Sequence, residues 1–360
     1  MPDAVKRNFA GILGSVPTEQ EYDRLAAAGI LEVLDQEHAV TVAELDARLS
    51  ERYFERSSGN IDPHHVTRAL GTLLASGVLI RDATPSRGTH NVDTIQPADK
   101  GRRATKIAQA ARRKRLLAAR YNGWAQGTRR HPNGLIGPAG ERAVRAAILD
   151  SQALVPATTG AGEVSNLLGV ELPGAADSGG FLVPLVSGIP GPTVTVLIEV
   201  KNIRSWIYPS AAELYQLLHK ATVLQQARPD SPIVPVLVCR RAHHTTFKMA
   251  RQLGFFVIPM SRQFAGEVDE EDVAEIRTEL HFQDLVRGAD ASQRVADRLR
   301  KTLPENATSF AATWRTTALD VDLTTTLGAL RRNELKPWER QRLVGDLRDT
   351  AMELGLDGGW

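Results

Sequence analysis

The sequence lacks the features that mark disulfide-rich, zinc-finger and membrane proteins. Cys239 is the only cysteine among 360 residues, which excludes an intrachain disulfide and a zinc site built from cysteines. No segment approaches the ~20 consecutive apolar residues that a membrane span needs. The first residues also lack the apolar core and cleavage site of a secretory signal. We therefore expect a cytoplasmic protein with no membrane partner.

Neither sign of charge dominates, and aromatic residues are few. The formal net charge is +2 and aromatic residues make up 5% of the chain, so the protein as a whole does not attract nucleic acid strongly. The charge is unevenly placed, however. Residues 101–133 contain ten Lys or Arg and no Asp or Glu, whereas residues 267–279 are acidic. A glycine-rich nucleotide-binding loop ending in Lys and Ser or Thr is missing, which argues against an ATP-driven motor.

The pattern of apolar residues and helix-start signals divides the chain into four parts. We expect three helices and a hairpin, then a basic and largely helical connector, then alternating helices and strands, and finally a polar helical region. No internal repeat or low-complexity tract is found. The boundaries that follow are 19–97, 98–133, 134–265 and 266–360.

The first part is expected to form helices at 21–34 and 42–49 and a third that starts at Asp62-Pro63 and ends near Gly77. Thr41 is expected to cap the second helix, with Glu44 as its capping-box partner. A strand at 78–80 and a partner around 91–95 follow. This order, and the stretch 70–82 (LGTLLASGVLIRD), resembles a winged-helix domain. The resemblance implies that the third helix enters a DNA major groove through the residues at its start, which are His64, His65, Thr67 and Arg68.

The most informative stretch is the segment 193–202 (TVTVLIEVKN), which is β-branched and almost entirely apolar. It reads as a central strand covered on both faces. Two charges in such a strand need a reason, because burying either one unpaired costs several kcal/mol. Glu199 and Lys201 are two residues apart and point to the same face. Ile198 and Val200 are expected to point into the core on the other face.

Asp177 supplies a second carboxylate. It precedes a Ser-Gly-Gly sequence that we expect to be a turn opening into a strand at 181–186, and residues 188–192 connect that strand to the next one. The resulting hairpin would bring Asp177 near Glu199. Two carboxylates suit Mg²⁺, which favours phosphate substrates and activates a bound water, and Lys201 would orient or deprotonate that water. Glu171 is an alternative to Asp177 if the strand starts earlier.

Helices and strands of fitting order flank this hairpin. A helix opening at Gly140 places Glu141 on the apolar stripe that faces the sheet, and a helix at 210–226 has Gln216 on its polar edge. A strand, a helix and a strand follow at 233–239, 245–253 and 255–259.

Together these elements resemble the PD-(D/E)xK, or restriction-endonuclease-like, nuclease superfamily over roughly residues 134–264. The resemblance implies an α/β fold with an αβββαβ core and a site that holds Mg²⁺ or Mn²⁺. Asp177 matches the Asp of the motif, although no Pro precedes it, and Glu199 and Lys201 match the E-x-K pair. Glu141 matches the helix Glu of resolvase-like members, and Gln216 matches a Gln found on the following helix in some members.

Structural roles are open for several of these residues. Asp177 can be a turn residue, Glu141 can be a helix-start carboxylate favoured by the macrodipole, and Gln216 can be a solvated edge residue. The densest basic run either contacts DNA phosphates or forms a solvated helix face. That run consists of Arg112, Arg113, Lys114 and Arg115.

We therefore expect a metal-dependent DNA nuclease, resembling restriction, anti-phage or repair enzymes, in which a homodimer would cut both strands. Two alternatives remain. One is a winged-helix DNA-binding regulator that uses a nuclease-like scaffold without catalysis. The other is an interaction module that recruits a partner through the C-terminal helices.

Overall fold

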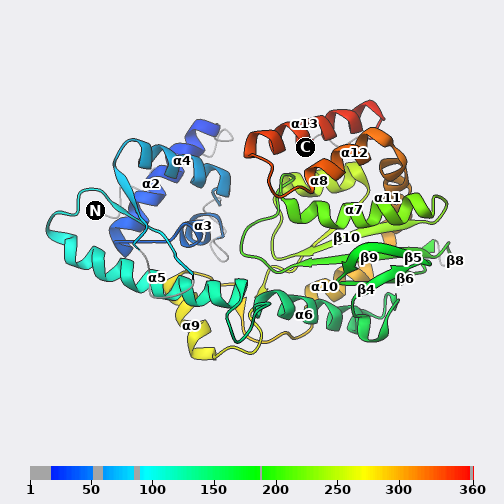
Figure 1. The fold of residues 1–360 in the computed structure, drawn as a ribbon, viewed down its shortest axis with the longest axis horizontal. Helices are drawn as coiled ribbons and strands as arrows, with labels where there is room; N and C mark the ends of the chain where they lie inside the picture. The colour runs from blue at the N-terminus through cyan, green and yellow to red at the C-terminus, as the bar shows by residue number, and fades with distance from the viewer. Residues whose placement is uncertain (1–17, 52–59, 85–89, 187–188, 357–359) are drawn as a thin grey trace. The chain divides into compact units, whose positions relative to one another are not determined.

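The chain forms two compact units, one comprising the residues up to Gly134 together with Val268–Leu285, the other comprising Leu135–Glu267 together with Val286–Trp360 (Figure 1). This computed structural model describes residues 18–51, 60–84, 90–186, 189–356 and 360. Among these residues, no helix is both long enough and apolar enough to cross a bilayer.

The first unit begins with three helices and a two-stranded sheet, as the sequence predicts. Thr18 starts the first helix through a complete capping box with Glu21. The three helices pack around an apolar core that includes Ile30, Leu45 and Val66. The elements are α2 (Glu19–Glu37), α3 (Val42–Ser50), α4 (Pro63–Ala75), β1 (Leu79–Asp82) and β2 (Thr94–Pro97).

Two details of this unit differ from the sequence prediction. The Thr41 hydroxyl accepts a hydrogen bond from the Glu44 backbone N–H at 3.2 Å, but the Glu44 carboxylate does not complete a capping box. It turns inward, where Arg48 and Lys114 bind it at 2.9 and 2.7 Å. The Thr41 cap is therefore confirmed, whereas charge pairing in the core has replaced the capping-box contact that was expected of Glu44. The strand β2 also starts later than expected, and Ile95 forms a bridge with Val40.

The predicted basic connector is a short turn, η1 (Gly101–Arg103), followed by the long helix α5 (Ala104–Gln126). α5 packs within the first unit against β2 and against α9 (Glu270–Glu279). Tyr121 of α5 makes an edge-on contact with Phe282, with ring centroids 5.0 Å apart. The acidic segment 267–279, distant in sequence, thus supplies the helix that neutralises one side of α5.

The second unit is built on a five-stranded mixed sheet in the order β11-β10-β9-β6-β3. β9 (Val194–Lys201) is the middle strand; it runs parallel to β10 (Ile233–Cys239) and antiparallel to β6 (Ser178–Leu182). β11 (Phe256–Pro259) and β3 (Val155–Pro156) form the edges. The prediction of a central, doubly covered strand at 193–202 is confirmed.

Helices cover both faces of this sheet (Figure 1). α6 (Ile136–Ser151) lies on one face, where Ala143, Val144 and Ile148 pack against alternate residues of β9 and β10. α7 (Ala212–Ala227) and α8 (His244–Leu253) lie on the other, in a second apolar core. The predicted helices at 210–226 and 245–253 and the strands at 233–239 and 255–259 are confirmed to within two residues.

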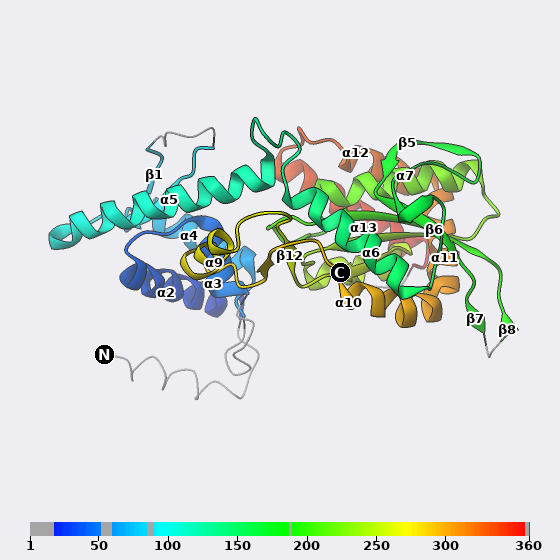
Figure 2. The same cartoon turned by 90° about the horizontal axis from the view of Figure 1, so that it is seen from below.

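Short elements and C-terminal helices complete the second unit. Trp314 and Ala318 of α11 enter the core on the α7 face, while Leu303 and Ala307 of the same helix enter the core on the α6 face. The ribbon β7–β8 projects from the sheet (Figure 2). The remaining elements are η2 (Thr159–Ala161), β4 (Val164–Leu167), β5 (Val170–Ala176), β7 (Leu185–Val186), β8 (Ile189–Pro190), β12 (Gln263–Phe264), β13 (Leu285–Val286), α10 (Gln293–Asp297), η3 (Arg298–Thr302), α11 (Leu303–Leu319), α12 (Val321–Leu330) and α13 (Pro337–Glu353).

Candidate active site

The central strand β9 carries Glu199 and Lys201 toward α7, while Ile198 and Val200 enter the core beneath α6. This alternation follows from the two-residue period of a strand and agrees with the prediction. The Glu199 side chain is only 5% exposed, so its charge needs partners. Lys201 is the first of them, since its Nζ donates to Glu199 Oε1 at 3.0 Å.

Asp177 lies directly opposite this pair. In the antiparallel register of β6 and β9, Ser178 pairs with Ile198, so Asp177 comes next to Glu199. The Val200 backbone N–H donates to Asp177 Oδ2 at 2.6 Å. The prediction that the hairpin brings Asp177 to Glu199 is confirmed.

The expected Ser-Gly-Gly turn is wrong, because Ser178, Gly179 and Gly180 are the first residues of β6. Glycine is needed here for close strand packing rather than for a turn. A Cβ on Gly180 would lie 2.6 Å from the Val155 backbone oxygen, and one on Gly179 would lie 3.1 Å from the Val196 oxygen. The strand expected at 181–186 therefore begins three residues earlier, and β7 forms its second half.

Helix α7 adds two further polar side chains to the cluster, one in contact with Lys201 and the other with Glu199. Gln216 Oε1 accepts a hydrogen bond from Lys201 Nζ at 3.1 Å. One helical turn later, Lys220 Nζ donates to Glu199 Oε2 at 2.8 Å and to the Ala175 carbonyl oxygen at 2.7 Å. Gln216 and Lys220 share a face of α7 because residues four apart are neighbours on a helix. Both oxygens of Glu199 are thus bound by an ammonium group.

Glu141 reaches the same region from α6 through Arg145. Arg145 donates from Nε to the Asp177 carbonyl oxygen at 3.3 Å and pairs with Glu141 at 3.5 Å. The helix begins at Ile136 rather than at the predicted Gly140. Gly140 instead allows a close approach between the helix and the end of β9, since a Cβ there would lie 2.3 Å from the Asn202 Cβ. The five predicted site residues Glu141, Asp177, Glu199, Lys201 and Gln216 are therefore brought together.

The electrostatics of this cluster are those of crowded carboxylates. Partial burial and the nearby charge of Glu199 raise the pKa of Asp177 to about 6, and Glu141 contributes in the same direction. The hydrogen bond from Val200 and the charge of Lys201 oppose the shift. Like charges held close together outside water disfavour ionisation unless a cation joins them. In this structure Lys201 and Lys220, which both contact Glu199, supply that positive charge.

The donors present suit a hard divalent cation. Asp177 and Glu199 offer carboxylate oxygens and Ala175 offers a backbone carbonyl, the oxygen ligands that Mg²⁺ and Mn²⁺ prefer. The alternative carboxylate, Glu171, is exposed on β5 in register with Asn166 and contacts none of these groups. Asp177 and Glu199 are thus the residues that would hold the metal.

The residues predicted to enter a major groove have unequal access to solvent. His64 and Thr67 are exposed on α4. His65 is buried; its Nδ1 lies 2.7 Å from Asp23 Oδ1, so the prediction that it contacts DNA is wrong for the folded helix. Arg68 is half-exposed and binds Asp23 Oδ2 through Nε at 3.1 Å.

Several residues of the basic run on α5 form ion pairs within the first unit. Lys114 is buried and binds Glu37 at 2.9 Å and Glu44 at 2.7 Å, so the prediction that it contacts DNA phosphates is wrong. Arg113 pairs with Glu279 at 3.0 Å and Arg115 with Asp82 at 2.8 Å. The premise that the run has no acid to pair with fails, because the acids come from other elements.

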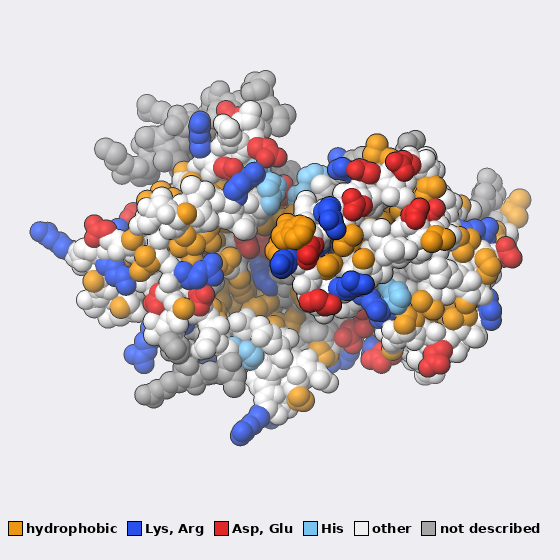
Figure 3. Space-filling view, turned by 45° about the horizontal axis from the view of Figure 1, so that its top comes forward, with side chains coloured by type: hydrophobic (Ala, Val, Ile, Leu, Met, Phe, Trp, Pro, Cys, Tyr) orange, Lys and Arg blue, Asp and Glu red, His pale blue; other side chains and the backbone are white. Residues whose placement is uncertain are grey.

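Some cations of this segment are nevertheless free. Among residues 101–133, all of which the structure describes, the exposed Lys and Arg side chains without an ion pair are Arg102, Lys106, Arg112, Arg129 and Arg130. On the face seen in Figure 3, Lys and Arg side chains are interspersed with Asp and Glu side chains. A weak and salt-sensitive attraction to a polyanion is what such a surface provides.

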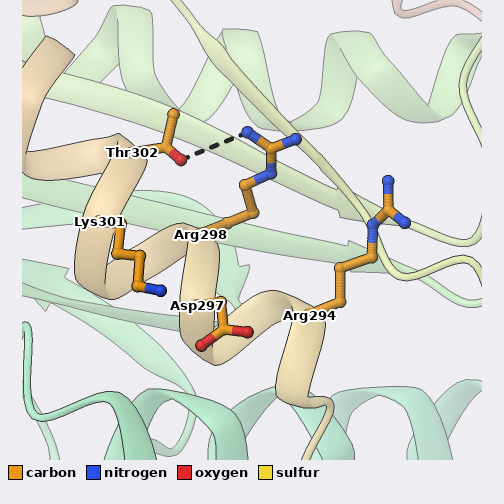
Figure 4. Close-up of a pocket in the computed structure, with 5 residues that line it drawn as sticks. All are labelled: Arg294, Asp297, Arg298, Lys301 and Thr302. Atoms are coloured by element: carbon orange, nitrogen blue, oxygen red, sulfur yellow. Dashed lines mark hydrogen bonds between the residues drawn. The ribbon is translucent and has the colours of Figure 1, made fainter.

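A separate pocket lies on α10 and η3, away from the carboxylate cluster in sequence and sharing no residue with it (Figure 4). Three cations and one carboxylate line this pocket, and Arg298 donates to Thr302 Oγ1 at 3.3 Å. One carboxylate among cations does not form a metal site. The lining residues are Arg294, Asp297, Arg298, Lys301 and Thr302.

Two residues of the carboxylate cluster were missed at the level of sequence. Lys220 is four residues after Gln216, and that spacing alone would have placed it on the same helix face. Arg145 is four residues after Glu141, and the same rule would have found it. His243 caps α8 by accepting a hydrogen bond from the Thr245 backbone N–H at 3.4 Å.

Comparisons of the chain with protein-family models, with curated proteins and with solved structures return no match.

Proposed function

We propose that the second unit is a Mg²⁺- or Mn²⁺-dependent nuclease that hydrolyses DNA phosphodiester bonds. The observation that carries this proposal is the meeting of Asp177, Glu199 and Lys201 where β6 and β9 pair. Two carboxylates and an ammonium gathered where β6 pairs with the buried central strand are costly for stability alone. Their arrangement is that of an acidic metal site with an adjacent cation.

The order of elements around the cluster supports a PD-(D/E)xK core. A helix with Glu141 precedes an antiparallel strand pair, which is followed by α7, a parallel strand, α8 and a last parallel strand. The site sits at the centre of the mixed sheet, with α6 and α7 on opposite faces. This arrangement supports the resemblance proposed for residues 134–264.

The residues of the chain would divide the chemistry among them. A divalent ion held by Asp177 and Glu199 would supply an activated water and neutralise charge that develops on the phosphate. Lys201, fixed by Glu199 and the Gln216 amide oxygen, is placed to orient the water or take its proton and to stabilise the transition state. Arg145 holds the Asp177 backbone in position through its carbonyl oxygen.

Several features of the first unit support a role for this unit in holding DNA. Its helices α2, α3 and α4, with β1 and β2 and the bridge between Val40 and Ile95, have the element order of a winged helix. Exposed His64 and Thr67, together with unpaired Arg112, provide groups for the DNA backbone or bases. We expect Arg112→Ala to weaken DNA binding by a similar factor for all sequences, with a salt slope reduced by about 1.

The test is cleavage and binding by the Glu199→Gln variant beside the wild type. We expect cleavage of plasmid DNA in Mg²⁺ or Mn²⁺ to be lost in the variant, while binding of the same DNA in EDTA stays within about 2-fold, well under the tenfold that 1.4 kcal/mol would produce. The control is Glu171→Gln, which removes an exposed carboxylate outside the cluster and should cleave normally. DNA binding without cleavage by all three proteins would instead favour a non-catalytic regulator. No DNA binding by any of them would leave the interaction module.

A further inference from the structure

Lys220 on α7 places its ammonium group where two oxygen atoms suited to bind a metal cation lie close together. Lys220 Nζ contacts one carboxylate oxygen of Glu199 and the carbonyl oxygen of Ala175, two residues before Asp177. Its side chain is 12% exposed, so it is withdrawn from solvent to make these contacts. A carboxylate oxygen and a carbonyl oxygen are also what a hard divalent ion takes as ligands.

The two lysines on Glu199 differ in how they are held. Lys201 lies on the same strand as Glu199, and the Gln216 amide oxygen accepts a hydrogen bond from it on the other side. A local movement of the strand therefore moves Lys201 together with Glu199. Lys220 comes from a different element, helix α7, and its second contact is the Ala175 carbonyl oxygen rather than a side chain that also holds the strand pair. Lys220 is therefore the ammonium that can leave with the least change to the strand.

The charge balance of the cluster gives a reason for Lys220 to leave Glu199 when a divalent ion binds. Around Glu141, Asp177 and Glu199 the cluster holds three cations, Arg145, Lys201 and Lys220, and Arg145 also lies 3.8 Å from the exposed Glu163. The carboxylates are therefore paired with cations of the chain itself before any other ion binds. A divalent ion adds two positive charges, and close like charges out of bulk water repel strongly.

We propose that Lys220 is an exchangeable counter-ion of Glu199: its ammonium binds between Glu199 and Ala175 in the metal-free protein and gives up Glu199 when a divalent cation binds. This inference rests on the proposed metal-dependent function and adds to it a competition between Lys220 and the divalent cation for Glu199. Lys220 thereby keeps the buried carboxylate paired without metal and sets the metal concentration at which the site fills.

The experiment is Mn²⁺ binding to the full-length protein, measured from the electron paramagnetic resonance signal of free Mn²⁺. We expect Lys220→Met to bind Mn²⁺ about 10-fold more tightly than the wild type, which corresponds to about 1.4 kcal/mol. Lys220→Arg keeps the positive charge and should bind like the wild type. Lys201→Met should tighten binding less than Lys220→Met does. The matched control is Lys248→Met, an exposed lysine on α8, which should change nothing.

A Lys220→Met variant that fails to fold is replaced by Lys220→Gln, which keeps a hydrogen-bond donor without the charge and should also bind more tightly. Unchanged or weaker Mn²⁺ affinity in the folded neutral variant would overturn the competition, since Lys220 would then support the site. That failure is distinct from failure of the proposed function. In the first case the wild type binds Mn²⁺ and cleaves DNA; in the second, neither the wild type nor the neutral variant binds Mn²⁺.

Discussion

Replacing Asp177 by Asn should stabilise the metal-free protein at neutral pH. The Asp177 carboxylate is partly withdrawn from water and lies near Glu199 and Glu141, which disfavours its ionised form. Asn has the same shape, and its carbonyl oxygen can still accept the hydrogen bond from the Val200 N–H. The substitution therefore removes a charge and leaves the packing almost unchanged.

The size and pH window of the effect follow from the pKa of Asp177. A rise from 3.8 to about 6 on folding corresponds to a free-energy cost of about 3 kcal/mol at most. Because the folded-state pKa lies above the unfolded-state value, wild-type stability falls as pH rises from about 4 to about 6. Asp177→Asn should thus add about 1–3 kcal/mol at pH 7.5 and almost nothing near pH 4.

Urea unfolding in EDTA, followed by tryptophan fluorescence from pH 4.5 to 8, measures this difference. Glu171→Gln is the matched control, because it removes an exposed carboxylate and should shift the midpoint little at any pH. An Asp177→Asn variant no more stable than the wild type at pH 7.5, or one whose gain does not change with pH, would refute the reasoning. The signal reports mainly on the second unit, which contains Trp206, Trp314, Trp338 and Trp360.

Two other substitutions test the packing that supports the site and the first unit. Gly140→Ala should lower the free energy of unfolding by about 1–3 kcal/mol, because its Cβ would collide with Asn202. Gly137→Ala in the same helix has open space around its Cβ and should raise the free energy of unfolding by about 0.5–1 kcal/mol. Thermal unfolding of the two variants compares these effects, and equal effects would contradict the close approach of Gly140 to Asn202. Lys114→Met should destabilise the first unit by about 1–3 kcal/mol, because it removes one of the two cations that bind the buried carboxylate of Glu44 and leaves only Arg48. Circular dichroism during urea unfolding would measure this loss, and an unchanged first transition would contradict it.

Periodicity and local chemistry predicted the parts of the fold that depend on short stretches of sequence. The apolar run around Glu199 could only be a covered strand, and two charges in such a run indicated a site. The strand 233–239 is entirely apolar and was predicted at its observed bounds. Asp62 followed by Pro63 marked the start of α4 because proline is preformed for the first helical position.

The parts that were missed depend on contacts between distant segments. The glycines after Asp177 were interpreted as a turn, and only the close approach of Val155 and Val196, on the neighbouring strands, shows why a strand needs glycine there. The residues 101–133 have no acid of their own, yet Glu44 and Glu279 pair with them from segments far away in sequence. Sequence spacing also cannot tell which of Glu171 and Asp177 faces Glu199, since the strand register decides it.

For the candidate site, the residue types could be predicted but the number of cations could not. Glu141, Asp177, Glu199, Lys201 and Gln216 were selected by pattern and resemblance, and they meet. Arg145 and Lys220 were passed over because a cation on a polar helix edge is common and carries little information by itself. Their importance comes only from the buried carboxylates that they contact.

The measurement that tests the central claim most directly is cleavage of supercoiled and linear DNA by the purified protein with Mg²⁺ or Mn²⁺, beside the Lys201→Ala variant. The account predicts metal-dependent nicking or cutting by the wild type and its loss in the variant, with DNA binding retained by both proteins. Tight, salt-sensitive DNA binding with no cleavage by either protein would contradict it.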